Sequence, residues 1–203
     1  MKTLKFLFLI GGITCMLTAC EMFLEEAPRN GNQESDLVLQ ARSLTKQLMV
    51  PYKAKMETSQ ADDALSEICS FISPTDFWGQ EHQVGGGNAT HIGNFTIDLK
   101  FCFHVVINEE GLPDIEGGFG EFTGGDGIIE ANNGDLLYTS ADGGVLVPIQ
   151  HDKYNFEFVT IFHVTGGTGR FENASGEITN YGFVKADGSG TDHIQEGTII
   201  LNK

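Results

Sequence analysis

The sequence predicts an all-β domain of antiparallel strands behind an N-terminal export segment. Three observations support this class. From Val50 onward, several segments alternate apolar and polar residues with a period of two, which is typical of strands with one wet face. Glycine-rich turn sequences separate these segments, and the chain contains 26 glycines in 203 residues. No long helical pattern lies between the segments, which excludes parallel strand–helix–strand units.

The first twenty residues have the pattern of an export signal. Lys2 and Lys5 precede an apolar run that is too short to span a bilayer comfortably. The run ends in Leu17-Thr18-Ala19-Cys20, which resembles the lipobox of bacterial lipoproteins, where the cysteine receives lipid and the signal is cut just before it. The alternative is an ordinary cleaved signal with a chance cysteine. We expect residues 1–19 to be removed and Cys20 to be the lipid attachment site.

A lipidated Cys20 implies a membrane anchor outside the cytoplasm, because two or three acyl chains hold a protein to a bilayer far better than one. The resemblance indicates the outer membrane of a Gram-negative bacterium and leaves the periplasmic and surface faces both open. The mature chain carries ten Lys and Arg against 28 Asp and Glu, a formal charge of −18. Such a surface repels nucleic acids and anionic headgroups, so neither is an expected partner.

Residues 20–46 are expected to form the lipidated tether and a short helix. Residues 21–33 are acidic and contain proline and glycine, as linkers do. Ser35 is a candidate helix cap and Pro51 a stop. The apolar positions at helical spacing between them are Leu37, Ala41, Leu44 and Leu48. The β domain is expected to occupy residues 47–203.

Three strands are the clearest. The first has apolar residues at alternate positions, namely Val50, Tyr52, Ala54 and Met56. The second, residues 94–107, places on one face Phe95, Ile97, Leu99, Phe101, Phe103, Val105 and Ile107. The third, residues 151–164, places together Tyr154, Phe156, Phe158, Phe162 and Val164. These faces are expected to point toward the interior.

Glycine marks the turns between strands. Asn133-Gly134 lies between two apolar segments and predicts a tight hairpin turn, since asparagine and glycine accept positive φ angles. The cluster Gly166-Gly167-Thr168-Gly169 lies between the strand ending at Val164 and a strand expected to begin near Arg170. A phosphate-binding loop would open a helix, and the sequence after this cluster is not helical, so the cluster is interpreted as a turn.

Residues 166–176, GGTGRFENASG, resemble the hairpin Gly-Gly-Thr-Gly-[Lys/Arg]-Phe-x-x-Ala-x-Gly of allene oxide cyclase-like and dirigent-like β-barrels. Residues 87–96, 131–135 and 196–200 resemble segments of uncharacterised bacterial lipoproteins that are expected to share this barrel. The resemblance covers roughly residue 50 to the end. It implies a closed eight-stranded antiparallel β-barrel of allene oxide cyclase-like or calycin-like type, without exposed sheet edges. Cyclase catalytic residues do not align outside the hairpin and are not transferred.

Cys69 and Cys102 remain after maturation. An even pair in an exported chain predicts a disulfide, with two separate buried thiols as the alternative. The sequence has neither a Cys-x-x-Cys motif nor a clear Cys/His ligand spacing. Residues 186–192 also miss the Asp-x-Asp-x-Asp-Gly pattern of calcium loops. We therefore predict no metal site and no cofactor.

An eight-stranded barrel is just wide enough to be filled by side chains or to hold one small ligand, and the aromatic faces fit either case. Three residues are candidates for orienting a ligand: His91, Glu130 and Glu157. The alternatives are a hydrogen-bonded histidine that bridges two strands and glutamates that face solvent. The motifs of serine hydrolases, zinc proteases and nucleotide loops are absent from the sequence, so no catalytic residue is predicted.

Three functions remain. The leading hypothesis is a lipid-anchored barrel outside the cytoplasm that acts as a binding or interaction module, with a small apolar molecule as candidate ligand. The second is a cyclase- or isomerase-like enzyme that uses the barrel cavity, which rests on the fold resemblance alone. The third is a structural lipoprotein of the envelope. A cavity lined by one or two polar side chains is the feature that separates them.

Overall fold

A computed structural model of the chain describes residues 47–64 and 66–202. The signal segment, the lipid site at Cys20 and the tether with its helix, expected within residues 1–46, lie outside the described residues. The described part consists of strands, turns and one short 3₁₀ helix, which confirms the all-β prediction. Nothing helical in this part reaches the length and apolarity needed to cross a bilayer.

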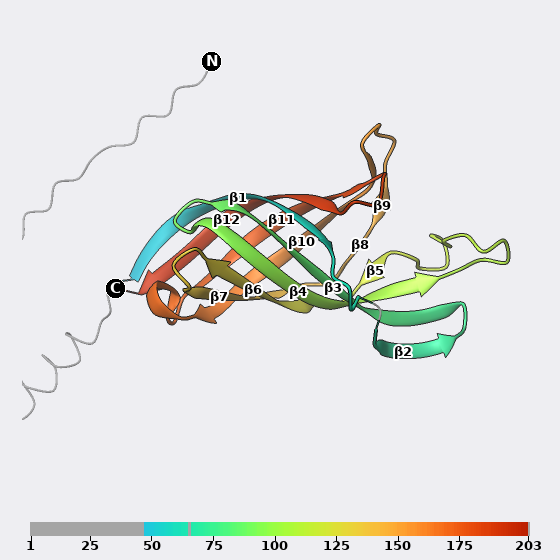
Figure 1. Ribbon diagram of the computed structural model, residues 1–203, viewed down its shortest axis with the longest axis horizontal. Coiled ribbons are helices and arrows are strands. Elements are labelled where there is room, and N and C mark those ends of the chain that lie inside the picture. The colour runs from blue at the N-terminus through green and yellow to red at the C-terminus, as the bar shows by residue number, and fades with distance from the viewer. Residues whose placement is uncertain (1–46, 65, 203) are drawn as a thin grey trace, which may run out of the picture. The chain divides into compact units, whose positions relative to one another are not determined.

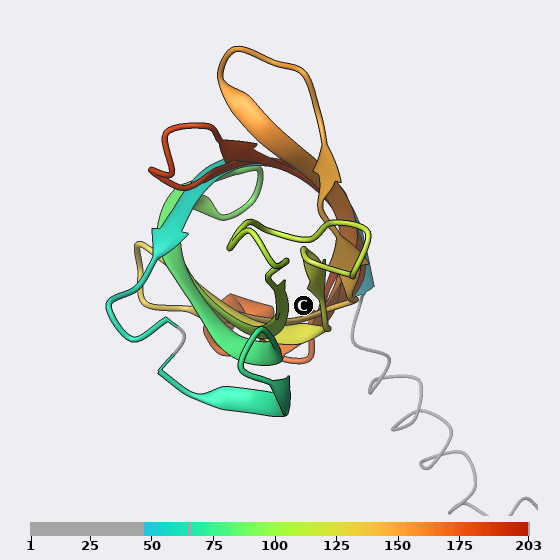
Figure 2. The same cartoon turned by 90° about the vertical axis from the view of Figure 1, so that its right-hand side faces the viewer.

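Eight strands form a closed antiparallel barrel, as predicted (Figures 1 and 2). Around the barrel they follow the order β1, β3, β4, β6, β7, β10, β11, β12, and β12 pairs again with β1. Their bounds are β1 (Gln47–Gln60), β3 (Asp76–Ala89), β4 (Gly93–Val106), β6 (Gly125–Ala131), β7 (Leu136–Ala141), β10 (Tyr154–Gly167), β11 (Ser175–Lys185) and β12 (Thr191–Asn202). The closing pair runs from Gln47 opposite Asn202 to Thr58 opposite Thr191. Closure leaves no long edge to pair with another chain.

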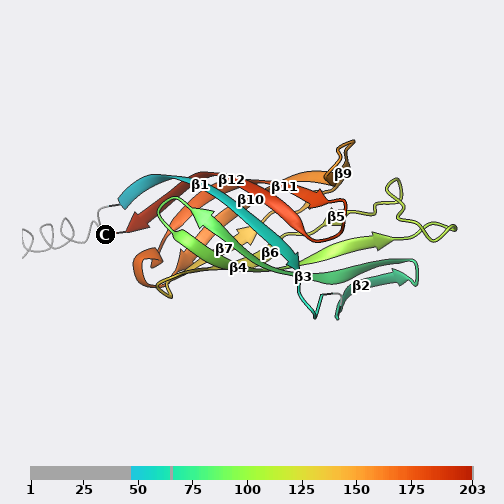
Figure 3. The same ribbon diagram turned by 45° about the horizontal axis from the view of Figure 1, so that its top comes forward.

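The two ends of the barrel differ. One end, here called the closed end, carries the β3–β4 and β6–β7 turns and the helix η1 (Gly169–Phe171). The other, here called the cavity end, carries four short strands: β2 (Ile68–Ser73), β5 (Glu121–Phe122), β8 (Gly144–Val145) and β9 (Val147–Pro148) (Figures 1 and 3). Viewed down the barrel, the connection between β4 and β5 passes across this second mouth (Figure 2).

Apolar side chains fill the closed end. The inward positions of β1 are those that the sequence predicts, because Val50, Tyr52, Ala54 and Met56 are all buried. Phe171 of η1 covers the closed end of the barrel and is 1% exposed. Arg170 lies over the Phe171 ring and donates from Nη2 to the carbonyl of Ile92 in the β3–β4 turn. The core therefore begins at the closed end and is built from inward residues of all eight strands.

The turns agree with the prediction in position and differ in detail. Gly134 has a φ of +83°, whereas Asn133 keeps a negative φ, so one positive φ suffices for the β6–β7 turn. The Gly134 amide donates to the carbonyl of Ala131, which closes the turn. The Gly166–Gly169 cluster is a turn, as interpreted. The next strand begins at Ser175, and not near Arg170, because η1 occupies part of the connection.

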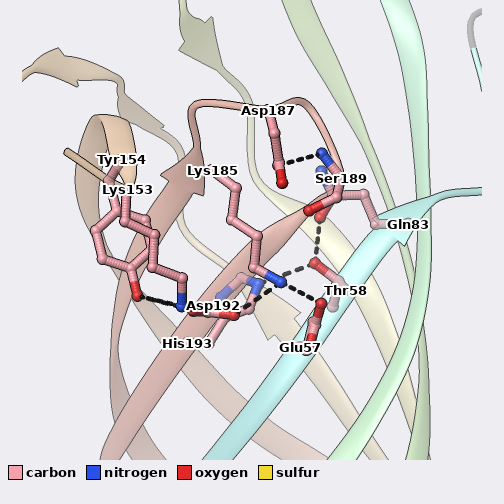
Figure 4. Close-up of polar contacts among 10 residues, drawn as sticks. All are labelled: Glu57, Thr58, Gln83, Lys153, Tyr154, Lys185, Asp187, Ser189, Asp192 and His193. Atoms are coloured by element: carbon pink, nitrogen blue, oxygen red, sulfur yellow. Dashed lines mark hydrogen bonds and ion pairs between the residues drawn. The ribbon is translucent and has the colours of Figure 1, made fainter.

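The inward face of β10 matches the prediction except at one residue. A register shift between Tyr154 and Phe156 moves Tyr154 to the outer wall. Its hydroxyl there donates to Oδ2 of Asp192 at 2.7 Å, and Lys153 and Lys185 contact the same carboxylate (Figure 4). These partners lower the pKa of Asp192 to about 2, with Lys153 as the main cause. The bulge could not be foreseen, because strict alternation would keep Tyr154 inside.

A disulfide between Cys69 and Cys102 joins β2 to β4 at the cavity end. Beside it, the Trp78 ring of β3 stacks on the ring of His104 at 4.5 Å. His104 also contacts Asp76 at 2.8 Å. Its burial therefore comes from contacts on the outer side of the barrel wall. The inward residues of β4 are those predicted from the sequence, except that Ile107 follows the end of the strand.

Candidate ligand-binding cavity

The cavity end of the barrel is hollow. It contains a cavity of about 480 Å³, lined by side chains of barrel strands and of the connections across the mouth. Known small-molecule sites fall in the range of about 300–1,000 Å³. The sequence left open whether the barrel is filled or hollow, and the structure has a filled half and a hollow half.

One side of the cavity is an aromatic wall. It combines Phe101 and Phe103 of β4 with Phe156, Phe158 and Phe162 of β10. Phe119, Phe122 and Leu146 of the mouth connections also line this side. The rings pack edge to face, with centroids 5.3 Å apart for Phe122 and Phe158 and 5.5 Å apart for Phe103 and Phe119. This geometry is the one that aromatic pairs prefer, so the wall is well packed.

Gly182 of β11 sets the position of the aromatic wall. A Cβ at this residue would overlap ring atoms of Phe158, so glycine is required for the ring to lie against the backbone of β11. The Phe158 ring then meets the imidazole of His193 at a centroid distance of 6.0 Å, edge to face. The aromatic wall and the polar side of the cavity join at this contact.

The other side is a polar wall built from β3, β1, β12 and β11, which are neighbours in the barrel. Gln60 and Gln83 donate to the two carboxylate oxygens of Glu81 at 3.0 and 3.2 Å. The hydroxyl of Thr58 donates to Oε1 of Gln83 at 2.7 Å (Figure 4). Nε2 of His193 lies 2.9 Å from Oγ1 of Thr58. A continuous hydrogen-bonded chain thus runs from Glu81 to His193.

The direction of these hydrogen bonds determines which nitrogen of His193 carries the proton. Because the proton of Thr58 points to Gln83, Oγ1 of Thr58 accepts from His193, so Nε2 carries the imidazole proton. Burial lowers the pKa of His193 to about 4, and the negative charge of Asp192 opposes this shift. The ring is therefore neutral near pH 7, and Nδ1 is a hydrogen-bond acceptor. Burial also raises the pKa of Glu81, against the opposing effect of its two amide donors.

A second polar layer separates the cavity from the filled core. The hydroxyl of Tyr52 donates to Oε1 of Gln195 at 3.1 Å, and Nε2 of Gln195 donates to Oδ1 of Asn180 at 3.1 Å. Asn180 and Gln195 have no exposed surface, and Asn180 lines the cavity. Burial raises the pKa of Tyr52 above its usual range, so this hydroxyl keeps its proton.

Two cavity atoms remain unpaired. Within the described ranges, Nδ2 of Asn180 and Nδ1 of His193 have no hydrogen-bond partner, although both are buried. Native structures pair the great majority of such groups, so each unpaired one calls for an explanation. A third unpaired atom, Nδ1 of His104, belongs to the outer contact with Trp78 and lies 3.8 Å from the carboxylate of Glu121. Since Asn180 and His193 both line the cavity, its wall holds one donor and one acceptor without a partner.

The three residues that the sequence suggested as ligand-orienting lie elsewhere. His91 is exposed in the β3–β4 turn at the closed end, with a φ of +63°. Glu130 and Glu157 are exposed on the outer faces of β6 and β10, as in the solvent-facing alternative. None of the three lines the cavity, and the structure does not bring them together. Among the described residues no cluster of histidine, cysteine and acidic side chains has the grouping of a metal site.

Sequence reasoning missed the polar wall because it expected inward faces to be apolar. In β12 the inward residues are Thr191, His193 and Gln195, which look like a wet face. A signal was present: Asp192 and Glu196 are polar as well, so both faces of the strand are polar at this end. A strand with two polar faces in a closed barrel must put one of them inside.

Fold and site together define a class: a closed eight-stranded antiparallel barrel with one end packed and a cavity with an aromatic and a polar wall at the other. Comparison of the chain with models of protein families, with curated proteins and with solved structures finds no match. The resemblance of residues 166–176 to allene oxide cyclase-like barrels therefore stays a prediction about family.

Proposed function

We propose that the protein binds a small, mainly apolar molecule in its barrel cavity, while lipid on Cys20 holds the chain at a membrane outside the cytoplasm. The observation that carries the first part is the cavity itself, with an aromatic wall opposite a polar wall. Such a surface takes up the body of an apolar molecule and fixes one polar group of it.

The site favours binding over catalysis. His193 is the cavity group best placed to move a proton, but its pKa of about 4 makes it a weak base near pH 7. Efficient general bases have a pKa near the working pH. The neutral imidazole is suited to accept a hydrogen bond. The other titratable group of this wall is Glu81, and both of its carboxylate oxygens already accept hydrogen bonds from Gln60 and Gln83. The cyclase- or isomerase-like alternative would have to use this paired carboxylate as its base.

The proposed location is the outer membrane of a Gram-negative bacterium, and it rests on the lipobox at residues 17–20. A barrel that is anchored by its N-terminus and carries no long sheet edge is suited to remain monomeric at a crowded membrane surface. The mass of the chain isolated from its native envelope tests this part: a diacyl or triacyl group on Cys20 is expected, and a bare Cys20 or a cut elsewhere would overturn it.

Native mass spectrometry tests the binding part. The full chain with Cys20→Ser, made in its own host and recovered without detergent, is expected to carry extra mass that disappears on denaturation. Val184 lines the cavity, so Val184→Trp fills part of it and is expected to abolish the extra mass. Val159 is 55% exposed on the outer face, so Val159→Trp is the matched control and should retain it. A bare mass for the unmodified cavity, or retention in Val184→Trp, would contradict cavity binding.

A further inference from the structure

The two unpaired cavity atoms lie on neighbouring strands and on the same inner face. Asn180 of β11 pairs with Gln195, and His193 of β12 pairs with Gly182, so Asn180 and His193 are diagonal neighbours. Residues in this relation are about 7–8 Å apart, and their Cβ atoms are somewhat closer. Both side chains therefore border the same part of the cavity, within reach of one small head group.

The two atoms have opposite hydrogen-bonding character. Oδ1 of Asn180 already accepts from Gln195, which leaves the Nδ2 amide as a free donor. Nδ1 of His193 is a free acceptor, because Thr58 holds the imidazole proton on Nε2. Asn180 is fully buried and His193 is 4% exposed, so leaving either atom unpaired costs stability that a ligand can recover.

Resting on the cavity binding proposed above, we propose that the ligand is an apolar molecule ending in a hydroxyl group, whose oxygen accepts from Nδ2 of Asn180 and whose proton is donated to Nδ1 of His193. A hydroxyl supplies one donor and one acceptor at the same oxygen, which matches both free atoms. The apolar remainder of the molecule lies along the aromatic wall.

Other head groups fit less well. An ether or ester oxygen can accept from Asn180 and has no proton for His193. A carboxylate directs lone pairs at Nδ1 of His193. It also enters a cavity whose polar wall already holds the buried carboxyl group of Glu81. An ammonium group cannot accept from the amide of Asn180. The geometry and the charge together select an uncharged hydroxyl.

Titration calorimetry with matched ten-carbon probes tests this selection. The probes are 1-decanol, methyl nonyl ether and decanoate, added to the full chain with Cys20→Ser. We expect 1-decanol to bind at least about tenfold more tightly than either other probe, since each leaves a buried polar atom unpaired. Equal binding of all three overturns the hydroxyl assignment and leaves cavity binding intact. Tightest binding of decanoate overturns it in favour of an anionic head group. Failure of all three to bind contradicts the proposed function itself.

A variant at His193 assigns the preference to its acceptor. In His193→Gln the side-chain amide can still donate to Thr58, as Nε2 does, and the Nδ1 acceptor is lost. The preference for 1-decanol over the ether is expected to fall below about threefold, with a smaller change in ether affinity. His91→Gln, exposed at the closed end, is the matched control and should keep the full preference. An unchanged preference in His193→Gln overturns the assignment, and the probe series on the parent chain decides the matter if that variant does not fold.

Discussion

Replacing Thr58 by valine removes one hydroxyl from the centre of the polar wall and nearly preserves the shape of the side chain. Thr58 has no exposed surface, and its hydroxyl joins Gln83 to His193. The change leaves Oε1 of Gln83 and the Nε2 proton of His193 without their partner. Each buried group that loses its partner costs about 1–3 kcal/mol. Moving the proton of His193 to Nδ1 would not recover this loss, because Nδ1 has no partner either. We therefore expect Thr58→Val to lower the free energy of unfolding by about 2–6 kcal/mol.

Equilibrium unfolding in urea, with the disulfide intact, measures this loss. Thr165 is also a threonine in a barrel strand, but it is exposed on the outer face of β10. Thr165→Val is therefore the matched control, with an expected change below about 0.5 kcal/mol. A loss below 0.5 kcal/mol in Thr58→Val, with an unchanged denaturant slope, would refute the hydrogen-bonded chain that fixes His193.

Three further predictions concern the disulfide and the two buried histidines. The double change Cys69→Ser with Cys102→Ser opens a link of sequence separation 33 and should lower the free energy of unfolding in urea by roughly 3 kcal/mol; no loss would contradict a structural role. The pKa of His193 is about 4 in the folded state, below the unfolded value near 6.5, so stability should fall as the pH drops from about 6.5 to 4, by roughly 3 kcal/mol. His193→Gln should remove this slope, which unfolding curves at several pH values would detect. His82 has the opposite sign: burial lowers its pKa, but Asp63 and Asp98 outweigh this and raise it. Its contribution is therefore full below about pH 6.5 and is lost as the pH rises through the folded pKa, a dependence that Asp63→Asn should weaken in the same unfolding curves.

The fold could be predicted where inward side chains are apolar and evenly spaced. In β1 the stripe from Val50 to Met56 is buried as predicted, and in β4 the stripe from Phe95 to Leu99 is buried as well. β3 was harder to foresee, because glycines at 85–87 interrupt its alternation and give no side chains to judge. A Cβ at Gly85 or Gly87 would meet the backbone of β1, and a Cβ at Gly86 would meet the carbonyl of Phe95 in β4. The glycines at these positions reflect the close approach of neighbouring strands, which the alternation of apolar and polar residues does not reveal.

The site could be predicted only in part. The phenylalanines of β4 and β10 mark the aromatic wall in the sequence, and the structure places them around the cavity. The sequence offers His91 as a ligand-orienting residue, yet it occupies the β3–β4 turn at the closed end. His193 was overlooked because its inward position depends on the register of β12 against β1 and β11. Register is a long-range property, and a shift of one residue would place His193 outside.

The polar layer of Tyr52, Gln195 and Asn180 gives a reason to regard the hollow half of the barrel as functional. Buried hydrogen-bonded groups contribute little net stability, and apolar residues of the same shape in their place are often neutral or stabilising. A barrel selected only for stability would extend the apolar core that fills the closed end. Here the inward stripe of β1 changes from Met56 to Thr58 and Gln60 where the cavity begins. Because two of the polar atoms at this boundary are also unpaired, the cavity end sacrifices stability that the same strands retain at the closed end. Sites that bind ligands accept this kind of loss, so the change in the stripe supports a cavity built for a ligand over a scaffold that failed to fill its interior.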